Sequence, residues 1–79
     1  MVIWVSTSDK QVVGYLSVED FCAMTSYEFP SNPRLIRNGV ELYRNERYIF
    51  GALRSASYVP TLRWSKERQA LEHIEGKGG

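Results

Sequence analysis

The groups that could do chemistry in this 79-residue sequence are mostly cations, and they gather in one segment. Residues 34–68 hold eight of the ten Lys and Arg residues against three carboxylates, whereas residues 1–33 hold one Lys against four carboxylates. Seven of the eight cations are arginine, whose planar guanidinium binds phosphate or carboxylate through paired hydrogen bonds. The total charge of +1 therefore conceals a basic segment that indicates an anionic partner. Solvated arginines paired with local glutamates would give the same pattern, so charge alone leaves both interpretations open.

The residues that most often serve in catalysis do not form a working set. Cys22 and His73 are far apart in the sequence, and the pattern predicts that they lie on different helices. Glu19 and Asp20 are adjacent, so on a helix they point to different faces and do not form an acid and base pair. Because a nucleophile needs a base and an orienting group together, we expect a protein that is not an enzyme. Cys22 is expected to be a small buried hydrophobe, and His73 to lie near the carboxyl end of a helix.

Metal and cofactor sites are not expected either. One cysteine and one histidine cannot supply the four ligands of a structural zinc site or form an internal disulfide. Gly39 and Gly51 stand alone, so no glycine-rich phosphate loop is present. No apolar run approaches the roughly 20 residues of a membrane helix, and no secretory signal is recognisable. We therefore expect a cytoplasmic protein without metal, cofactor or membrane contact.

The elements that must position the cations follow from the hydrophobic pattern. Residues 2–5 and 12–16 predict a pair of strands at the amino end. Ser17 is the expected N-cap of a helix over residues 18–25, with Asp20 at its third position in a variant of the capping box. The apolar side chains of this helix recur at i, i+3, i+4 and i+7, which predicts one buried stripe. That stripe consists of Val18, Phe21, Cys22 and Thr25.

A second, short helix is predicted after the break at Pro30, because proline disfavours helix at the residue before it. Ser31 would cap this helix, and Gly39 would end it in a left-handed conformation. Arg34 and Arg37 would share its outer side.

The rest of the chain predicts mostly strands. Residues 40–50 predict a hairpin whose tip carries arginines, and residues 51–58 are ambiguous between a loop and a short helix. Residues 59–64 predict an edge strand, since Pro60 has no N–H to donate. A last helix is expected over residues 66–75. At this length the chain should form one domain of modest stability over residues 1–75, followed by a disordered tail at residues 76–79.

Parts of this pattern resemble the excisionase-type and MerR-like winged-helix domains. Residues 15–25 resemble their first helix, which follows a small β element and ends at a Thr. Residues 34–39, Arg-Leu-Ile-Arg-Asn-Gly, resemble the basic second helix, and residues 44–50 resemble the wing. Residues 62–67 resemble the strand and capped helix that close such domains. The resemblance covers residues 15–75 and implies an α+β fold, a small winged helix-turn-helix-like domain with an extra N-terminal β-hairpin.

The resemblance also implies a partner, double-stranded DNA. The second helix would enter the major groove, where Arg34 or Arg37 could donate to a guanine. Arg44 and Arg47 on the wing would hold phosphates or enter the minor groove. Proteins of this kind act as architectural or regulatory factors of phages and mobile elements, in DNA recombination or transcription regulation. They bend DNA, recruit a recombinase and often bind as several copies side by side. The expected DNA-binding residues are Ser31, Asn32, Arg34, Arg37, Arg44 and Arg47.

Two other functions fit the sequence. A small phage-type modulator or inhibitor of a host protein would use aromatic anchors, because Tyr, Trp and Arg dominate interface hot spots. Its edge strand around Leu62 could extend a partner's sheet. An RNA-binding β-platform would need aromatic side chains in an alternating set on adjacent strands. Residues 48–50 alone do not form such a set. The anchors of a protein modulator would be the apolar residues 1–5 and Tyr43, Tyr48, Tyr58 and Trp64.

Overall fold

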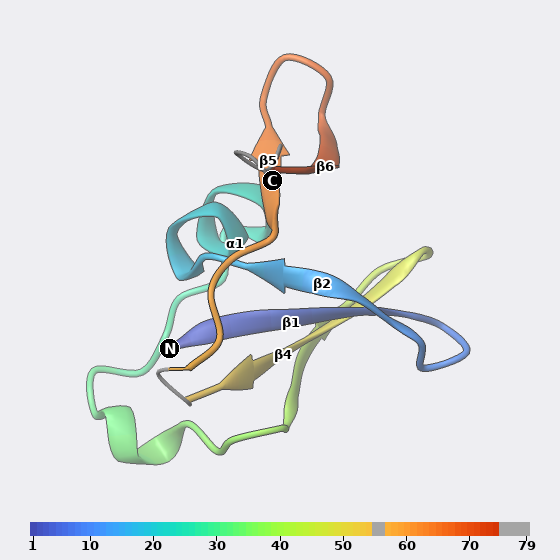
Figure 1. The fold of residues 1–79 in the computed structure, drawn as a ribbon. Coiled ribbons are helices and arrows are strands. Elements are labelled where there is room, and N and C mark those ends of the chain that lie inside the picture. The colour runs from blue at the N-terminus through green and yellow to red at the C-terminus, as the bar shows by residue number, and fades with distance from the viewer. Residues whose placement is uncertain (55–56, 75–79) are drawn as a thin grey trace.

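Over the residues that the structure describes, the protein folds as one six-stranded sheet with a single α-helix packed on it (Figure 1). The computed structural model describes residues 1–54 and 57–74, and for Pro33 the backbone alone. The strands are β1 (Val2–Thr7), β2 (Val12–Leu16), β3 (Glu41–Arg44), β4 (Tyr48–Leu53), β5 (Leu62–Ser65) and β6 (Ala70–His73). The helices are α1 (Val18–Thr25) and the short 3-10 turn η1 (Pro33–Leu35).

The strand order in the sheet is β3-β4-β1-β2-β5-β6. Neighbouring strands are antiparallel except β2 and β5, which run parallel where Leu16 lies opposite Leu62. In the centre, Ile3 lies opposite Leu16, and Val5 lies opposite Phe50. The amino-terminal strand pair predicted from the sequence is therefore present, with β1 at the middle of the sheet.

The hydrophobic core lies on one face of this sheet, which we term the helix-covered face. Successive side chains of a strand point to opposite faces, so Ile3 and Val5 point to this face together with Leu16 and Phe50. The ring of Phe21, from α1, packs on these residues and is itself fully buried. Its centroid lies 5.7 Å from that of Phe50. The helix thus contributes one large aromatic side chain to a core that consists mainly of strand residues.

The predicted N-cap of the helix is confirmed. The Ser17 side chain accepts a hydrogen bond from the Asp20 amide at 3.1 Å and caps α1. The helix ends at Ser26, whose φ of 60° places it in the left-handed region. The Asp20 carboxylate, which was expected to close a capping box with Ser17, instead accepts the backbone N–H of Trp64 at 3.0 Å. This bond ties β5 to the first turn of α1.

A close approach between β2 and β5 requires a glycine. A Cβ placed on Gly14 would lie 2.6 Å from Thr61 Oγ1 and 2.9 Å from Leu62 Cγ. Thr61 also makes two hydrogen bonds with Tyr15: its backbone N–H donates to the Tyr15 carbonyl at 2.8 Å, and its hydroxyl accepts the Tyr15 N–H at 3.0 Å. Any larger residue at position 14 would push the β5–β6 hairpin away from the central strands.

The prediction of a winged helix-turn-helix-like α+β domain is wrong. The expected second helix is only the three-residue turn η1, because Pro30 and Pro33 interrupt the segment and its next residues join the sheet. There Gly39, at φ 82°, donates its N–H to the Ala52 carbonyl. The two-helix unit that the winged-helix resemblance requires is therefore not formed.

The expected last helix is wrong as well. Residues 66–69 form a turn, and β6 follows as an antiparallel partner of β5. Gln69 takes a left-handed φ of 51°, and the Ser65 hydroxyl accepts the Arg68 amide at 3.2 Å. A serine that caps a turn therefore gave the same local signal as a helix cap. Residue 75 and the tail expected at residues 76–79 lie outside the described residues.

Candidate functional site

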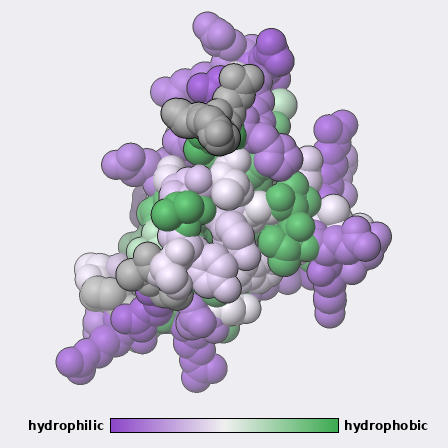
Figure 2. Space-filling view, viewed as in Figure 1, coloured by the Kyte–Doolittle hydropathy of each residue, from purple (hydrophilic) through white to green (hydrophobic). Residues whose placement is uncertain are grey.

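The sheet face that points away from α1 is the first candidate surface, and we term it the open face. No helix covers it among residues 1–54 and 57–74. In Figure 2, apolar and near-neutral residues gather at the centre of the molecule, and hydrophilic side chains project around its edge. The open face forms a shallow groove of about 420 Å³ lined by Trp4, Ser6, Lys10, Val12, Tyr15, Glu41, Arg44, Ile49 and Leu53.

Three aromatic side chains stand together on the open face. Trp4 on β1 and Tyr15 on β2 are directly opposite each other in the antiparallel register, and both are half-buried. The ring of Tyr58 packs on that of Tyr15, with centroids 4.8 Å apart and an angle of 42° between the planes. Tyr58 belongs to the linker that crosses in front of β1 and β2 in Figure 1. The face thus presents an indole from β1 and, on the adjacent strand β2, a tyrosine ring that packs on the ring of Tyr58.

The position of Trp4 depends on a glycine. Gly51 on β4 lies opposite Trp4, and a Cβ placed on it would stand 2.2 Å from Cζ2 of the indole. The indole therefore lies directly over the Gly51 backbone, where any other residue would place a side chain. This contact holds the largest ring of the open face close against the sheet.

Charged groups lie at the end of the open face near the β1–β2 turn. Arg44 makes a bidentate pair with Glu41, through Nη2–Oε1 at 2.9 Å and Nε–Oε2 at 3.1 Å. The hydrogen bond from Arg44 lowers the pKa of Glu41, and the positive charges of Arg44 and Lys10 lower it further. Lys10 lies at the end of the turn with φ 69° and also lines the groove. Glu41 therefore offsets part of the positive charge of Arg44 and Lys10.

The structure does not bring the residues predicted to bind DNA into one site. Arg34 and Arg37 are exposed on the η1 segment, whereas Arg44 and Arg47 lie at the β3–β4 turn, at the other end of β3. In Figure 1, η1 lies at the lower left and the β3–β4 turn at the right, so the two segments are at opposite ends of the sheet. Ser31 and Asn32 are exposed beside η1, and the Asn32 side chain accepts the Arg34 amide at 3.0 Å.

Arg54 joins the first of these two groups, and sequence reasoning missed it. Its backbone N–H donates to Asn38 Oδ1, and its guanidinium Nη1 donates to the Ile36 carbonyl at 3.4 Å. Because Ile36 and Asn38 flank Arg37, these bonds place Arg54 next to Arg37. We term Arg34, Arg37 and Arg54 the arginine corner.

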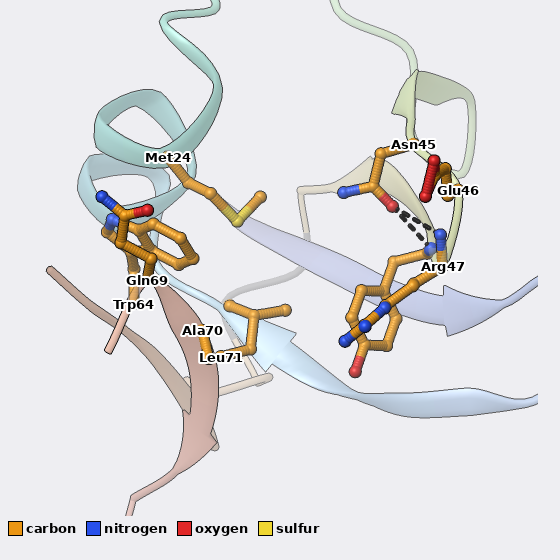
Figure 3. Close-up of a pocket in the computed structure, with 9 residues that line it drawn as sticks. Met24, Asn45, Glu46, Arg47, Trp64, Gln69, Ala70 and Leu71 are labelled. Carbon is orange, nitrogen blue, oxygen red and sulfur yellow. Dashed lines mark hydrogen bonds between the residues drawn. The ribbon is translucent and has the colours of Figure 1, made fainter. Parts of the chain in front are cut away.

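A second hollow, of about 610 Å³, lies between the β3–β4 turn and the β5–β6 hairpin (Figure 3). Met24 and Leu71 point into it, and Trp64 and Gln69 form the wall on the hairpin side. On the opposite wall, Asn45 Oδ1 accepts the amides of Arg47 and Tyr48, both at 2.8 Å. The Asn45 side chain on this wall therefore stabilises the β3–β4 turn to which it belongs. The lining residues are Met24, Asn45, Glu46, Arg47, Tyr48, Trp64, Gln69, Ala70 and Leu71.

The sequence analysis missed Tyr15, and it named Trp4 only as one of the apolar residues 1–5, because the pattern predicts strands but not which face each side chain occupies. Trp4 lies between Ile3 and Val5, so its neighbours are buried on one side of β1 and it points to the other. Tyr15 alternates in the same way with Leu16. The period of two in strands is the signal that could have found the pair, once β1 and β2 were placed side by side.

Comparisons with known proteins add no relative. The chain matches no known protein family, no curated protein and no solved structure. Within the described residues, no helix is long and apolar enough to cross a membrane. The same residues contain no group of three His, Cys, Asp or Glu side chains that could hold a metal ion.

Proposed function

We propose that this protein binds single-stranded nucleic acid on the open face of its sheet, as a cytoplasmic binding protein without catalytic activity. The observation that carries the proposal is the cross-strand pair Trp4 and Tyr15, which Tyr58 extends at a ring distance of 4.8 Å. Unpaired bases stack on aromatic side chains of this kind, and each stacked base contributes roughly 1–3 kcal/mol. Aromatic rings on adjacent strands are also the arrangement by which a sheet binds splayed-out bases.

The charges around the open face support the same partner. Lys10 and Arg44 line the groove beside the rings, where they would contact phosphates between stacked bases. Glu41 limits the positive charge at this end, so an incoming phosphate competes with its carboxylate for Arg44.

Duplex DNA, the partner expected from the sequence, fits this geometry less well. A helix that enters the major groove presents basic side chains. In the described part of the chain the sole α-helix is α1, which has Glu19 and Asp20 in its first turn and no basic residue in its last. Binding of duplex DNA therefore stays a prediction. Binding of a recombinase or a host protein stays a prediction as well.

Titration with labelled oligonucleotides tests the proposal. The probes are oligothymidylate and oligouridylate of about ten nucleotides, within the usual range of single-strand site sizes, and a duplex of the same length. We expect the single strands to bind more tightly than the duplex. Tyr58→Ala should weaken single-strand binding by about 1–3 kcal/mol.

The matched control is Tyr43→Ala, because Tyr43 is a similarly exposed tyrosine on the helix-covered face. Its side chain is 36% exposed, against 43% for Tyr58. Its ring packs on Phe50, so the folded fraction of each variant is measured first. Equal weakening by both variants, or no single-strand binding at micromolar protein, contradicts the proposal. Tighter binding of the duplex would support the partner expected from the sequence instead.

A further inference from the structure

The arginine corner is a group of cations that the stacking surface does not explain. Arg34, Arg37 and Arg54 are all exposed, and none of them forms an ion pair within residues 1–54 and 57–74. Of the four exposed arginines elsewhere in the described chain, Arg47 also forms no ion pair, but the other three do. Arg44 pairs with Glu41, and Arg63 and Arg68 both pair with Glu72, at distances between 2.9 and 3.4 Å.

The fold itself holds the corner together. Arg54 donates to Ile36 and Asn38, on either side of Arg37, and Arg34 lies on the adjoining turn η1. Like charges on adjoining segments that form no ion pair repel each other and do not stabilise the folded state. The arrangement is therefore better explained by a bound anion than by a contribution to stability.

The corner also lies at the rim of the open face. Arg54 directly follows Leu53, which is the last residue of β4 and lines the groove. The linker that carries Tyr58 begins beyond the same strand end. Figure 1 shows η1 and the end of β4 together on one side of the sheet, with the β1–β2 turn on the other side. The aromatic rings thus lie between the arginine corner and the cations Lys10 and Arg44.

We infer that the arginine corner binds the phosphates of the strand whose bases stack on the open face. This inference rests on the proposed function. It implies that the bound strand runs from the arginine corner across the aromatic rings toward Lys10. Guanidinium groups bind phosphate oxygens through paired hydrogen bonds. A chain that reaches from the rings to the corner needs about four nucleotides or more, near the lower end of known single-strand sites.

Salt dependence separates the corner from the stacking surface. For single strands, the slope of log K against log salt changes by roughly 0.7 for each phosphate contact. With labelled oligothymidylate of about ten nucleotides, the double variant Arg34→Gln/Arg37→Gln should bind more weakly. Its slope should be smaller by about 1.4. Neither side chain makes a hydrogen bond within the described residues, so the fold should tolerate both changes.

The control is Arg63→Gln/Arg68→Gln on the β5–β6 hairpin, which removes two exposed arginines that pair with Glu72 and should leave the slope unchanged. Tyr58→Ala serves as the second reference, because loss of stacking weakens binding without changing the slope. An unchanged slope in the Arg34→Gln/Arg37→Gln protein, with binding itself intact, overturns the inference and leaves the proposed function standing. Failure of the unmodified protein to bind oligothymidylate overturns both.

Discussion

The indole of Trp4 lies over the backbone of Gly51, with 2.2 Å between its Cζ2 atom and the place where a Cβ of residue 51 would stand. Trp4 and Gly51 are also directly opposite each other on β1 and β4. The contact makes the glycine a requirement for the aromatic surface, since a side chain at position 51 and the indole cannot occupy the same space.

Gly51→Ala should therefore displace the indole and destabilise the protein. Forcing an extra methyl group into a packed site typically costs about 1–3 kcal/mol, which urea unfolding followed by Trp fluorescence would measure. Oligothymidylate binding should weaken at the same time. The Val40 carbonyl oxygen lies 2.6 Å from the same Cβ position, so adding Trp4→Val to this variant should restore stability only in part and should not restore binding. If stability and binding both return, the indole has no part in recognition.

The bond between Asp20 and Trp64 gives a second prediction. Asp20→Ala leaves the Trp64 N–H without its acceptor, and loss of one partner of such a bond costs about 1–3 kcal/mol. Hydrogen exchange at the Trp64 amide should accelerate more than exchange in β1. Asp20→Asn keeps an oxygen acceptor and should be milder. Equal exchange in both variants would show that the carboxylate does not hold the β5–β6 hairpin on α1.

The ion pair of Glu41 and Arg44 predicts how binding responds to pH. Because the pKa of Glu41 is lowered in the folded protein, its contribution to stability is present above the ordinary carboxylate pKa. That contribution is lost as the pH falls through the lowered value, and it is small because the pair is exposed. Protonation of Glu41 also frees Arg44, so oligonucleotide binding should tighten in the same pH range.

Glu41→Gln tests this relationship at neutral pH. The variant should bind oligothymidylate more tightly than the unmodified protein, with a salt slope larger by about 0.7 for one added phosphate contact. Glu46→Gln, which removes an exposed carboxylate at the β3–β4 turn, is the control for net charge alone. Equal tightening by both variants would mean that overall charge, and not the release of Arg44, determines the effect.

The sequence allowed prediction of the elements whose signals are local. The capped helix at residues 18–25 was correct because Ser17 and the apolar stripe act within one element. The second and last helices were wrong because serine caps and prolines mark turns as readily as helix starts. Pairing with distant strands, as in the Gly39 bond to Ala52, then decided the outcome.

The candidate site depended on non-local information. The exposure of Trp4 and its contact with Gly51 follow from the strand order, which places β4 beside β1 although the two are distant in the sequence. Contacts with Ile36 and Asn38 likewise bring Arg54 to Arg37. The basic middle segment was visible in the composition, but its division between two ends of the sheet was not.

The most direct test of the central claim is a titration of the protein with oligothymidylate of about ten nucleotides, observed by NMR on a ¹⁵N-labelled sample. The account predicts that the Trp4 indole N–H and the amides of β1 and β2 shift first, together with Tyr58. Shifts confined to the hollow around Trp64, or no shifts at low salt, would contradict it.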